Sequence, residues 1–381
     1  MTIGRLLGIA CNPMPSERQE RLLATAIRGM PDWDGLEPAL SVHRLGPLLH
    51  WQIRHYGIDC PAPVRRVLAG MYAREKAITE VKTGFLLKLV AHLDEQGIES
   101  VILKGGALAH LAYPEPHLRP REDLDILVAE AHLASVTDTL EQCGLRAEPP
   151  KNRYERLSHQ WPIASGLVAG VPIHVEAHRW VLNARLGGYA GLPGLRRPLL
   201  AYTVDGRELK SLHPEEMLVT QLRRFRHLSD PFRAISLADL VGWAEYQGHG
   251  IDWPTLCRKQ PSVRAAYRAL QQVTPLGDDV CERLGLDPDT PTGGVDPTRE
   301  HYRGWPLNCF GAHARVRPTK GTLIRETLLP STWWIRLAYG ASPGLGTWVA
   351  RVVHHPANLV AQSARRAYMG RASEHRFFGR A

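Results

Sequence analysis

The spacing of apolar side chains predicts helices over most of the first 96 residues of the chain. The longest of these helices covers Pro61–Gln96, where apolar residues return every three or four positions and so line one helix face. Glycine ends helices readily because it tolerates left-handed backbone angles, which places the end of this helix at Gly97. Residues 1–97 are therefore predicted to form an N-terminal helical region.

The pattern changes at residue 98 to short apolar runs separated by turns, which is typical of strands that alternate with helices. Asp205-Gly206 stands between two alternating segments within 201–212 and predicts a tight hairpin turn. Residues 98–212 are thus predicted to form an α/β core with a small mixed sheet and a hairpin. We expect its strands at 100–104, 123–128, 160–168 and 171–178, and its helices at 105–113 and 131–143.

Helical spacing returns after residue 212. A helix is expected to begin at His213-Pro-Glu-Glu, because proline fits the first turn and acidic side chains favour a helix N-terminus. The rest of the chain divides by the same criteria into a helical domain (213–286), a Pro- and Gly-rich linker (287–299) and a helical tail (300–381). The predicted fold class is α+β, with the small mixed-sheet core embedded between N-terminal and C-terminal helical regions.

Composition fits a globular protein of more than one packed unit, with 381 residues, of which 44% are hydrophobic and 22% charged. The six cysteines are scattered without a C-x-x-C pair, which favours a reducing, cytoplasmic compartment over a disulfide or zinc framework. The apolar run at the N-terminus is too short for a signal peptide, and no apolar run is long enough to predict a transmembrane segment.

The net charge of +9 is concentrated in the tail. Residues 301–381 hold twelve Lys and Arg against two acidic residues, so the first 300 residues are close to neutral. The tail also contains several tryptophans and other aromatic residues. Basic residues interleaved with aromatics could bind nucleic acid, another polyanion or an anionic membrane surface, but a solvated helical surface is the favoured interpretation.

Candidate chemistry gathers in residues 101–128. Asp123 and Asp125 alternate on a strand, so their side chains point to the same face. Two carboxylates at a strand end suit Mg²⁺, which takes few protein carboxylates and leaves other positions to water and phosphate. Gly105-Gly106 opens a helix after the preceding strand, where backbone N–H groups can approach phosphates. Together these features predict a site for a nucleoside triphosphate.

The order Lys104-Gly105, Tyr113, Arg119 and Asp123-Leu-Asp125-Ile-Leu-Val resembles the uncharacterised bacterial nucleotidyltransferase family of the polymerase-β-like superfamily. The resemblance is strongest over residues 98–182. Val171-Pro-Ile-His-Val-Glu-Ala-His178 looks like the strand that carries the superfamily's third carboxylate, with Glu176 at the acidic position and His178 after it. Two departures are visible: Gly106 stands where the superfamily usually has serine, and Glu176 replaces the commoner aspartate.

The resemblance implies transfer of a nucleoside monophosphate from a triphosphate such as ATP to a hydroxyl or phosphate acceptor, with release of pyrophosphate. It implies that Asp123, Asp125 and Glu176 are catalytic and hold Mg²⁺ or Mn²⁺. It further implies that Lys104, Gly105, Gly106, Arg119 and His178 bind the nucleotide. The acceptor could be a peptide or protein, a sugar or another small molecule, which would suit a tailoring enzyme of a peptide or polysaccharide pathway.

Three alternatives remain open at this point. The missing serine at Gly106 would suit transfer of a sugar or phosphosugar from a nucleotide-sugar at the same metal site. A non-catalytic protein could use this fold and act through its basic tail. His174, Glu176 and His178 alternate on one strand face and could hold a transition metal, because imidazole is a common ligand of such metals.

Overall fold

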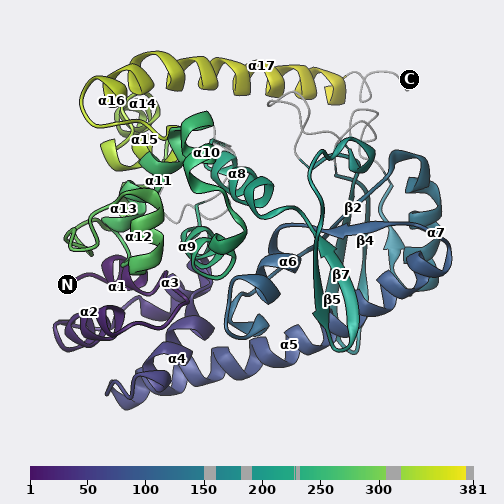
Figure 1. Cartoon of the computed structure of the whole chain (residues 1–381), viewed down its shortest axis with the longest axis horizontal. Coiled ribbons are helices and arrows are strands. Elements are labelled where there is room, and N and C mark those ends of the chain that lie inside the picture. The colour runs from purple at the N-terminus through teal and green to yellow at the C-terminus, as the bar shows by residue number, and fades with distance from the viewer. Residues whose placement is uncertain (150–159, 182–190, 227, 229–231, 306–318, 375–381) are drawn as a thin grey trace. The chain divides into compact units, whose positions relative to one another are not determined.

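The computed structural model describes residues 1–149, 160–181, 191–226, 228, 232–305 and 319–374. The chain divides into two compact units, which we call the helical unit and the sheet unit. The helical unit comprises Met1–Tyr72 and Gln221–Ala367, and the sheet unit comprises Ala73–Thr220 and Tyr368–Ala381. Figure 1 shows the sheet with its neighbouring helices and the elements of the helical unit.

The sheet unit is built on a mixed sheet with the strand order β3-β4-β5-β2-β1-β7-β6. Two strand pairs are parallel, β2 with β5 and β1 with β7, and the other neighbouring pairs are antiparallel. This arrangement confirms the predicted α+β class. The strands are β1 (Ser100–Ile102), β2 (Leu124–Val128), β3 (Arg146–Ala147), β4 (Gln160–Val168), β5 (Val171–His178), β6 (Leu200–Val204) and β7 (Arg207–Ser211).

Local sequence explains why these strands form where they do. All five residues of β2 are buried, as expected of a central strand that is apolar apart from one acid. Asp205 and Gly206 both have positive φ, 46° and 80°, which is the geometry of the tight turn predicted for the β6–β7 hairpin. The predicted strands are therefore confirmed to within a few residues, and the short β3 is an addition that its two residues could not signal.

The helices of the sheet unit flank the strands in Figure 1. The long helix α5 (Ala62–Glu95) ends two residues before Gly97, whose φ of 69° confirms the predicted stop. The predicted helices at 105–113 and 131–143 are confirmed with slightly different ends. They are α6 (Lys104–Leu111) and α7 (Leu133–Gln142), accompanied by the short 3-10 turns η1 (Pro116–Leu118), η2 (Glu130–His132) and η5 (Leu192–Gly194).

The helical unit packs around α9 (Ile235–Gln247), which is buried along most of its length and includes the fully buried Trp243. Tyr267 on a neighbouring helix is also fully buried and donates a 2.7 Å hydrogen bond to the Leu240 carbonyl. α8 (Pro214–Arg224) lies at the division between the units, and the 3-10 turn η6 (Gly248–Gly250) follows α9. The other helices before the tail are α1 (Ile3–Ile9), α2 (Glu17–Arg28), α3 (Leu36–His43), α4 (Gly46–His55), α10 (Trp253–Lys259), α11 (Ser262–Gln271), α12 (Asp278–Leu284) and α13 (Pro297–Glu300).

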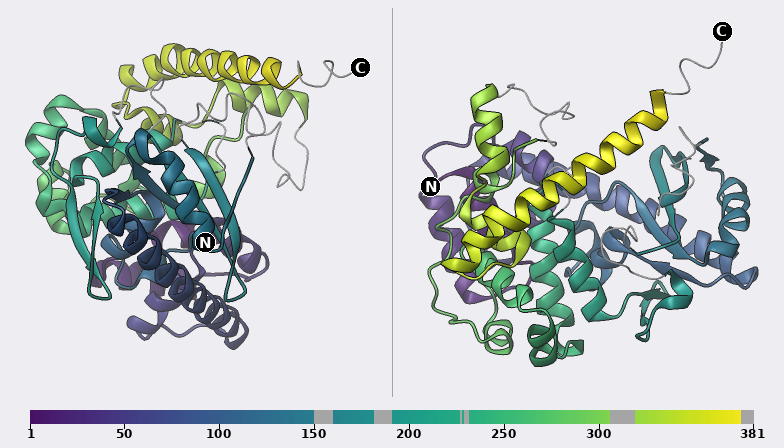
Figure 2. Two further views of the ribbon diagram at one scale, coloured as in Figure 1. Left: turned by 90° about the vertical axis from the view of Figure 1, so that its right-hand side faces the viewer. Right: turned by 90° about the horizontal axis from the view of Figure 1, so that it is seen from above.

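The described part of the tail is helical, as predicted. Its elements are α14 (Lys320–Leu328), α15 (Thr332–Tyr339), α16 (Leu345–Val349), the π-helical turn η8 (Ala350–His354) and α17 (His355–Glu374), the long yellow helix of Figure 2. The π turn precedes Pro356, which lacks the N–H of a regular helical hydrogen bond, so the helical irregularity lies beside this proline. Residues 306–318 and 375–381 of the predicted tail lie outside the described residues. Among the helices that the structure describes, none has the length and apolar character needed to span a bilayer.

Candidate active site

The parallel pairing of β2 with β5 places the candidate catalytic residues beside one another. Asp125 is the register partner of Glu176, and Leu127 is the partner of His178. Residues two apart on a strand share a face, so the side chains of Asp125, Glu176 and His178 lie on one side of the sheet. Two strands that lie far apart in the sequence thus supply a single polar cluster.

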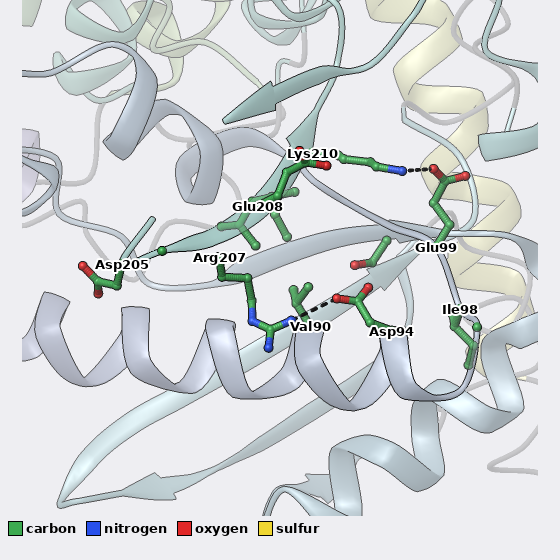
Figure 3. A pocket seen from close by; sticks show the side chains of 13 residues that line it. Val90, Asp94, Ile98, Glu99, Asp205, Arg207, Glu208 and Lys210 are labelled. Atoms are coloured by element: carbon green, nitrogen blue, oxygen red, sulfur yellow. Dashed lines mark hydrogen bonds and ion pairs between the residues drawn. The ribbon is translucent and has the colours of Figure 1, made fainter. Parts of the chain in front are cut away.

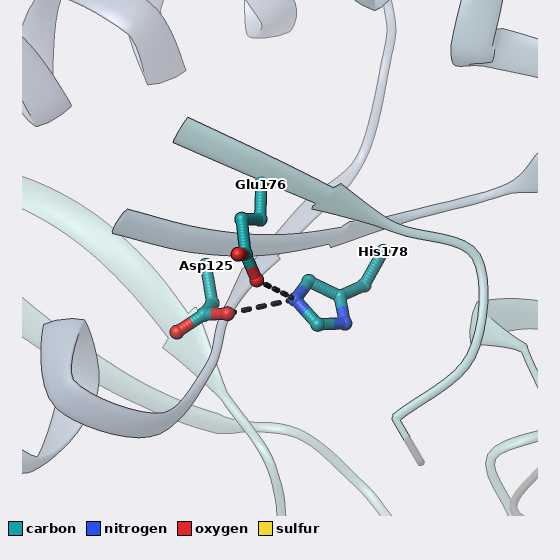
Figure 4. A group of neighbouring side chains, drawn as sticks. All are labelled: Asp125, Glu176 and His178. Atoms are coloured by element: carbon teal, nitrogen blue, oxygen red, sulfur yellow. Dashed lines mark hydrogen bonds and ion pairs between the residues drawn. The ribbon is translucent and has the colours of Figure 1, made fainter. Parts of the chain in front are cut away.

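Figure 4 shows the Asp125 and Glu176 carboxylates on either side of one ring nitrogen of His178. Asp125 Oδ1 accepts a 2.6 Å hydrogen bond from Lys104 Nζ and lies 2.7 Å from His178 Nε2. Glu176 Oε2 lies 3.5 Å from the same imidazole nitrogen and 3.9 Å from Lys104 Nζ. Asp125 and His178 are almost fully buried, so these charges interact with little screening by water.

Neighbouring groups keep both carboxylates of the cluster ionised. Burial alone would raise the pKa of Asp125, but the charges and hydrogen bonds of Lys104 and His178 outweigh it and lower that pKa. Burial likewise opposes ionisation of Glu176, whose pKa is nevertheless held well below its usual value by its interactions with His174 and His178 and by the Lys104 charge. The cluster therefore carries negative charge that a cation can bind.

Asp123 differs from Asp125, although the sequence predicted equal roles for them. It precedes the first residue of β2, and burial followed by the nearby Asp125 charge raises its pKa. Within the described residues, the donor atoms that converge to within 4.8 Å of one another belong to Asp125, Glu176 and His178. The metal-binding role of Asp123 stays a prediction.

The first turn of α6 lies beside the cluster and fits the predicted phosphate-binding turn. Lys104 begins this helix with a φ of 44°, a left-handed angle that is strained for a residue with a side chain. A Cβ atom on Gly105 would lie 2.3 Å from Arg119 Nη1, so glycine lets the buried guanidinium approach the helix N-terminus. A Cβ atom on Gly106 would lie 2.8 Å from Ile102 Cγ2. Packing against β1 therefore explains why glycine, and not serine, stands at position 106.

The loop that leads into β2 is fastened to α5. The Arg121 guanidinium is buried and donates a 2.9 Å hydrogen bond to Thr83 Oγ1, while Lys82 Nζ donates to the Arg121 carbonyl. Burial, reinforced by the charge of Arg119, lowers the pKa of Arg121 to about 10. These contacts fix the approach of the chain to Asp123.

Sequence reasoning missed a chain of contacts behind Glu176. His174 Nδ1 lies 2.6 Å from Ser165 Oγ, which donates a 2.7 Å hydrogen bond to Glu148 Oε1. His174 Nε2 lies 3.8 Å from Glu176 Oε1, and the interaction with this carboxylate raises the pKa of His174. Ser165 meets His174 through the antiparallel register of β4 with β5, which no local pattern in the sequence reveals.

The donor set fits a divalent cation. Asp125 Oδ2 is buried and accepts no hydrogen bond within the described part of the chain, so it remains available as a ligand atom. Two carboxylates suit Mg²⁺ or Mn²⁺, and the His178 imidazole adds a ligand of the kind transition metals accept. The rival set of His174, Glu176 and His178 is not favoured, because His174 stands outside the converging donor atoms.

A second polar region lies at the other end of β1 (Figure 3). This cavity is lined by the C-terminal end of α5, the residues leading into β1 and the β6–β7 hairpin. Its walls carry two ion pairs, Arg207 with Asp94 at 3.1 Å and Lys210 with Glu99 at 2.6 Å. Its lining residues include none of the predicted site residues.

Comparison with known proteins gives one match that covers most of the chain. Residues 30–273 match the profile of a protein family described as "Uncharacterised nucleotidyltransferase". No curated protein matches the chain.

Three solved structures resemble parts of the chain. A solution structure of the antibiotic-resistance factor ANT(2'')-Ia is 16% identical, covering 50% of this chain and 95% of its own, with a TM-score of 0.34. A crystal structure of ANT(2'')-Ia with adenylyl-2''-tobramycin is 14% identical, covering 50% of this chain and 99% of its own, with a TM-score of 0.34. A nucleotidyltransferase-like protein of Paracoccidioides brasiliensis is 15% identical, covering 54% of this chain and 96% of its own, with a TM-score of 0.31.

Proposed function

This chain belongs to the uncharacterised nucleotidyltransferase family. We propose that the Asp125–Glu176–His178 cluster is its catalytic centre. We further propose that the enzyme transfers a nucleoside monophosphate from a nucleoside triphosphate to an acceptor. The family predicted from the sequence is confirmed, and with it the enzyme class. The observation that carries the assignment of the site is the β2–β5 register, which brings two ionised carboxylates together beside the glycine-rich first turn of α6.

In this proposal Asp125 and Glu176, together with Asp123, hold Mg²⁺ or Mn²⁺, and His178 orients Asp125 through its 2.7 Å contact. The metal would supply charge neutralisation at the α-phosphate. An acceptor oxygen attacks the α-phosphorus, its bond to that phosphorus forms as the bond to pyrophosphate breaks, and the acceptor proton passes to a base. Glu176 is assigned as the base from its place in the cluster, where its ionised carboxylate can accept a hydrogen bond from the acceptor hydroxyl.

The chain's own cations and backbone bind the remaining phosphates. The N-terminal amides of α6, freed of side-chain bulk at Gly105 and Gly106, provide hydrogen-bond donors for an anion. Arg119, buried against Gly105, and Lys104 supply positive charge at the same helix end. The acceptor is proposed to be a hydroxyl-bearing sugar, peptide or other small molecule. A role as a tailoring enzyme of a peptide or polysaccharide pathway stays a prediction. The cytoplasmic location likewise stays a prediction.

No observation favours transfer from a nucleotide-sugar. That alternative depended on the missing serine at position 106, and the close approach of Ile102 explains the glycine without a change of donor. The non-catalytic alternative is also disfavoured, because membership of a nucleotidyltransferase family is accompanied by an intact carboxylate cluster.

The test is calorimetric binding of each of the four triphosphates and a nucleotide-sugar, with Mn²⁺, to the wild type and to single variants. We expect one triphosphate to bind, and Asp125→Asn to weaken that binding at least about 10-fold by removing a ligand charge. Asp123→Asn tests separately whether Asp123 belongs to the metal site. Lys210→Met, at the far end of β1, is the matched control and should bind as the wild type does.

Equal triphosphate binding by Asp125→Asn and wild type would refute the assignment of the site. Preferential binding of the nucleotide-sugar would replace the proposed donor.

A further inference from the structure

The outer face of the helix at residues 345–364 is apolar where a solvated helix would be polar. Its exposed positions contain no Asp, Glu, Lys or Arg. Leu345, Trp348 and Val360 are 75%, 60% and 69% exposed. We use the name outer face for the exposed residues of this stretch, which are Leu345, Trp348, Val352, Val353, His354, Ala357, Val360, Ala361 and Ala364.

The opposite side of the same helix is firmly packed within the helical unit. His355 is fully buried, with Nδ1 3.0 Å from Tyr339 Oη and Nε2 2.7 Å from the Thr327 carbonyl oxygen. Leu359 and Gln362 follow on the same buried side. One side of the helix is therefore packed against the helical unit, and the outer face is exposed to solvent.

An ordinary surface helix of the same unit shows the contrast. The exposed positions of α2 include Glu17, Glu20, Arg21 and Arg28, the polar pattern expected of a helix that faces water. Eight of the eleven large hydrophobic residues that are exposed among the described residues lie between Ile324 and Val360. Exposed apolar residues concentrated in this way mark an interaction surface.

The charge around the outer face is positive. Lys320 and Arg325 are exposed on α14, which also carries the exposed Ile324 and Leu328. The acid of α14, Glu326, pairs with Arg303 at 3.0 Å. The sequence after the outer face continues with Arg365, Arg366 and Arg371, so the apolar stretch is flanked by basic residues on both sides.

We infer that the outer face docks on an anionic membrane surface, with its helix lying in the plane of the interface. Tryptophan, leucine and valine enter the boundary between headgroups and acyl chains, and flanking basic side chains bind anionic headgroups. Nucleic acid fits less well, because proteins bind it through basic grooves and aromatic side chains on which bases stack, and the outer face is mostly aliphatic. A second copy of the chain would bring two strongly basic tails together and so meets electrostatic repulsion.

The experiment is co-sedimentation of the full chain with vesicles of phosphatidylcholine, with and without phosphatidylglycerol. We expect binding to the anionic vesicles, weaker binding to the neutral ones, and loss of binding at high salt. Trp348→Ser/Val352→Ser/Val360→Ser should reduce partitioning at least about 10-fold, because each apolar side chain contributes by its buried area. The matched control is Val42→Ser/Leu167→Ser, which removes exposed apolar residues from other elements and should bind as the wild type does.

A second readout is Trp348 fluorescence, which should shift to shorter wavelength with anionic vesicles in the wild type but not in Trp348→Phe. The inference is overturned if the triple variant and the control bind equally, or if the wild type binds no vesicle. It is also overturned if the triple variant keeps vesicle binding but loses binding to RNA or changes from dimer to monomer.

Discussion

Two lysine–carboxylate pairs lie near the two ends of β1, and in both the Nζ–O distance is 2.6 Å. In the first, Lys104 is 15% exposed and Asp125 is 1% exposed. In the second, Lys210 is 40% exposed and Glu99 is 50% exposed. The same contact therefore occurs once inside the candidate site of Figure 4 and once at the open cavity of Figure 3.

The difference teaches that distance alone does not set the energy of an ion pair. Water and salt screen the exposed pair, so its formation contributes about 0–1 kcal/mol. Loss of one partner from the buried pair leaves a charge with little water to solvate it, which costs about 3–5 kcal/mol. The buried pair is consequently the one whose charges can shape binding and reactivity.

The largest effect is expected when the buried pair is broken by Asp125→Asn. The free energy of unfolding should fall by about 3 kcal/mol, the lower end of the range, because Glu176 lies close enough to retain Lys104. Nucleotidyl transfer, once an acceptor is known, should fall more than about 100-fold through loss of a metal ligand. Urea denaturation gives the first quantity. A loss of stability below about 1 kcal/mol would show that this pair behaves like the exposed one.

A pH series sharpens the same comparison. The pKa of Asp125 lies below its usual 3.8, so its charge stabilises the folded chain at neutral pH and down to about pH 4. This contribution is lost only as the pH falls from there through the lower folded value. The difference in unfolding free energy between wild type and Asp125→Asn should thus be constant from about pH 7 to about pH 4 and shrink below it. A difference that closes above about pH 5 would indicate a raised pKa.

Next in size is the effect of Lys104→Met on metal affinity. The Lys104 ammonium lies among the donor atoms of Asp125, His178 and Glu176 that would bind a cation, so the two cations compete for one place. Two cations within about 4 Å repel by more than about 1 kcal/mol even in water, so removal of Lys104 should raise Mn²⁺ affinity at least about 10-fold. Electron paramagnetic resonance of free Mn²⁺ measures this. Unchanged or weaker Mn²⁺ binding would contradict the competition.

The fold could be predicted closely from the sequence where local rules decide it. The hairpin turn at Asp205-Gly206, the helix stop at Gly97 and the start of α8 follow from residues whose backbone preferences are strong. The strand order could not be predicted, because the parallel pairs β2–β5 and β1–β7 join segments about 50 or more residues apart and depend on the whole unit.

Most residues of the candidate site could be predicted from the sequence, but their positions relative to one another could not. Asp125 was identified from its strand pattern, and Glu176 and His178 from the family resemblance, but their meeting depends on register. Lys104 was expected to reach phosphate, and its contact with Asp125 depends on a left-handed φ that no propensity for lysine suggests. The Glu148–Ser165–His174 chain was missed because Glu148, just after β3, and Ser165 in β4 have no recognisable spacing in the sequence.

The smallest effect is expected from Lys210→Met, the same chemical change as in Lys104→Met but at the exposed pair. Glu99 raises the pKa of Lys210 through a hydrogen bond, yet both side chains are well solvated and can rotate away from each other. The unfolding free energy should therefore change by less than about 1 kcal/mol, and Mn²⁺ affinity should not change. Urea denaturation and Mn²⁺ titration of the two methionine variants side by side make the comparison direct. If Lys210→Met destabilised the chain as much as Lys104→Met, burial would not be what separates the two pairs, and the cavity of Figure 3 would have to be treated as a second electrostatic centre of the sheet unit.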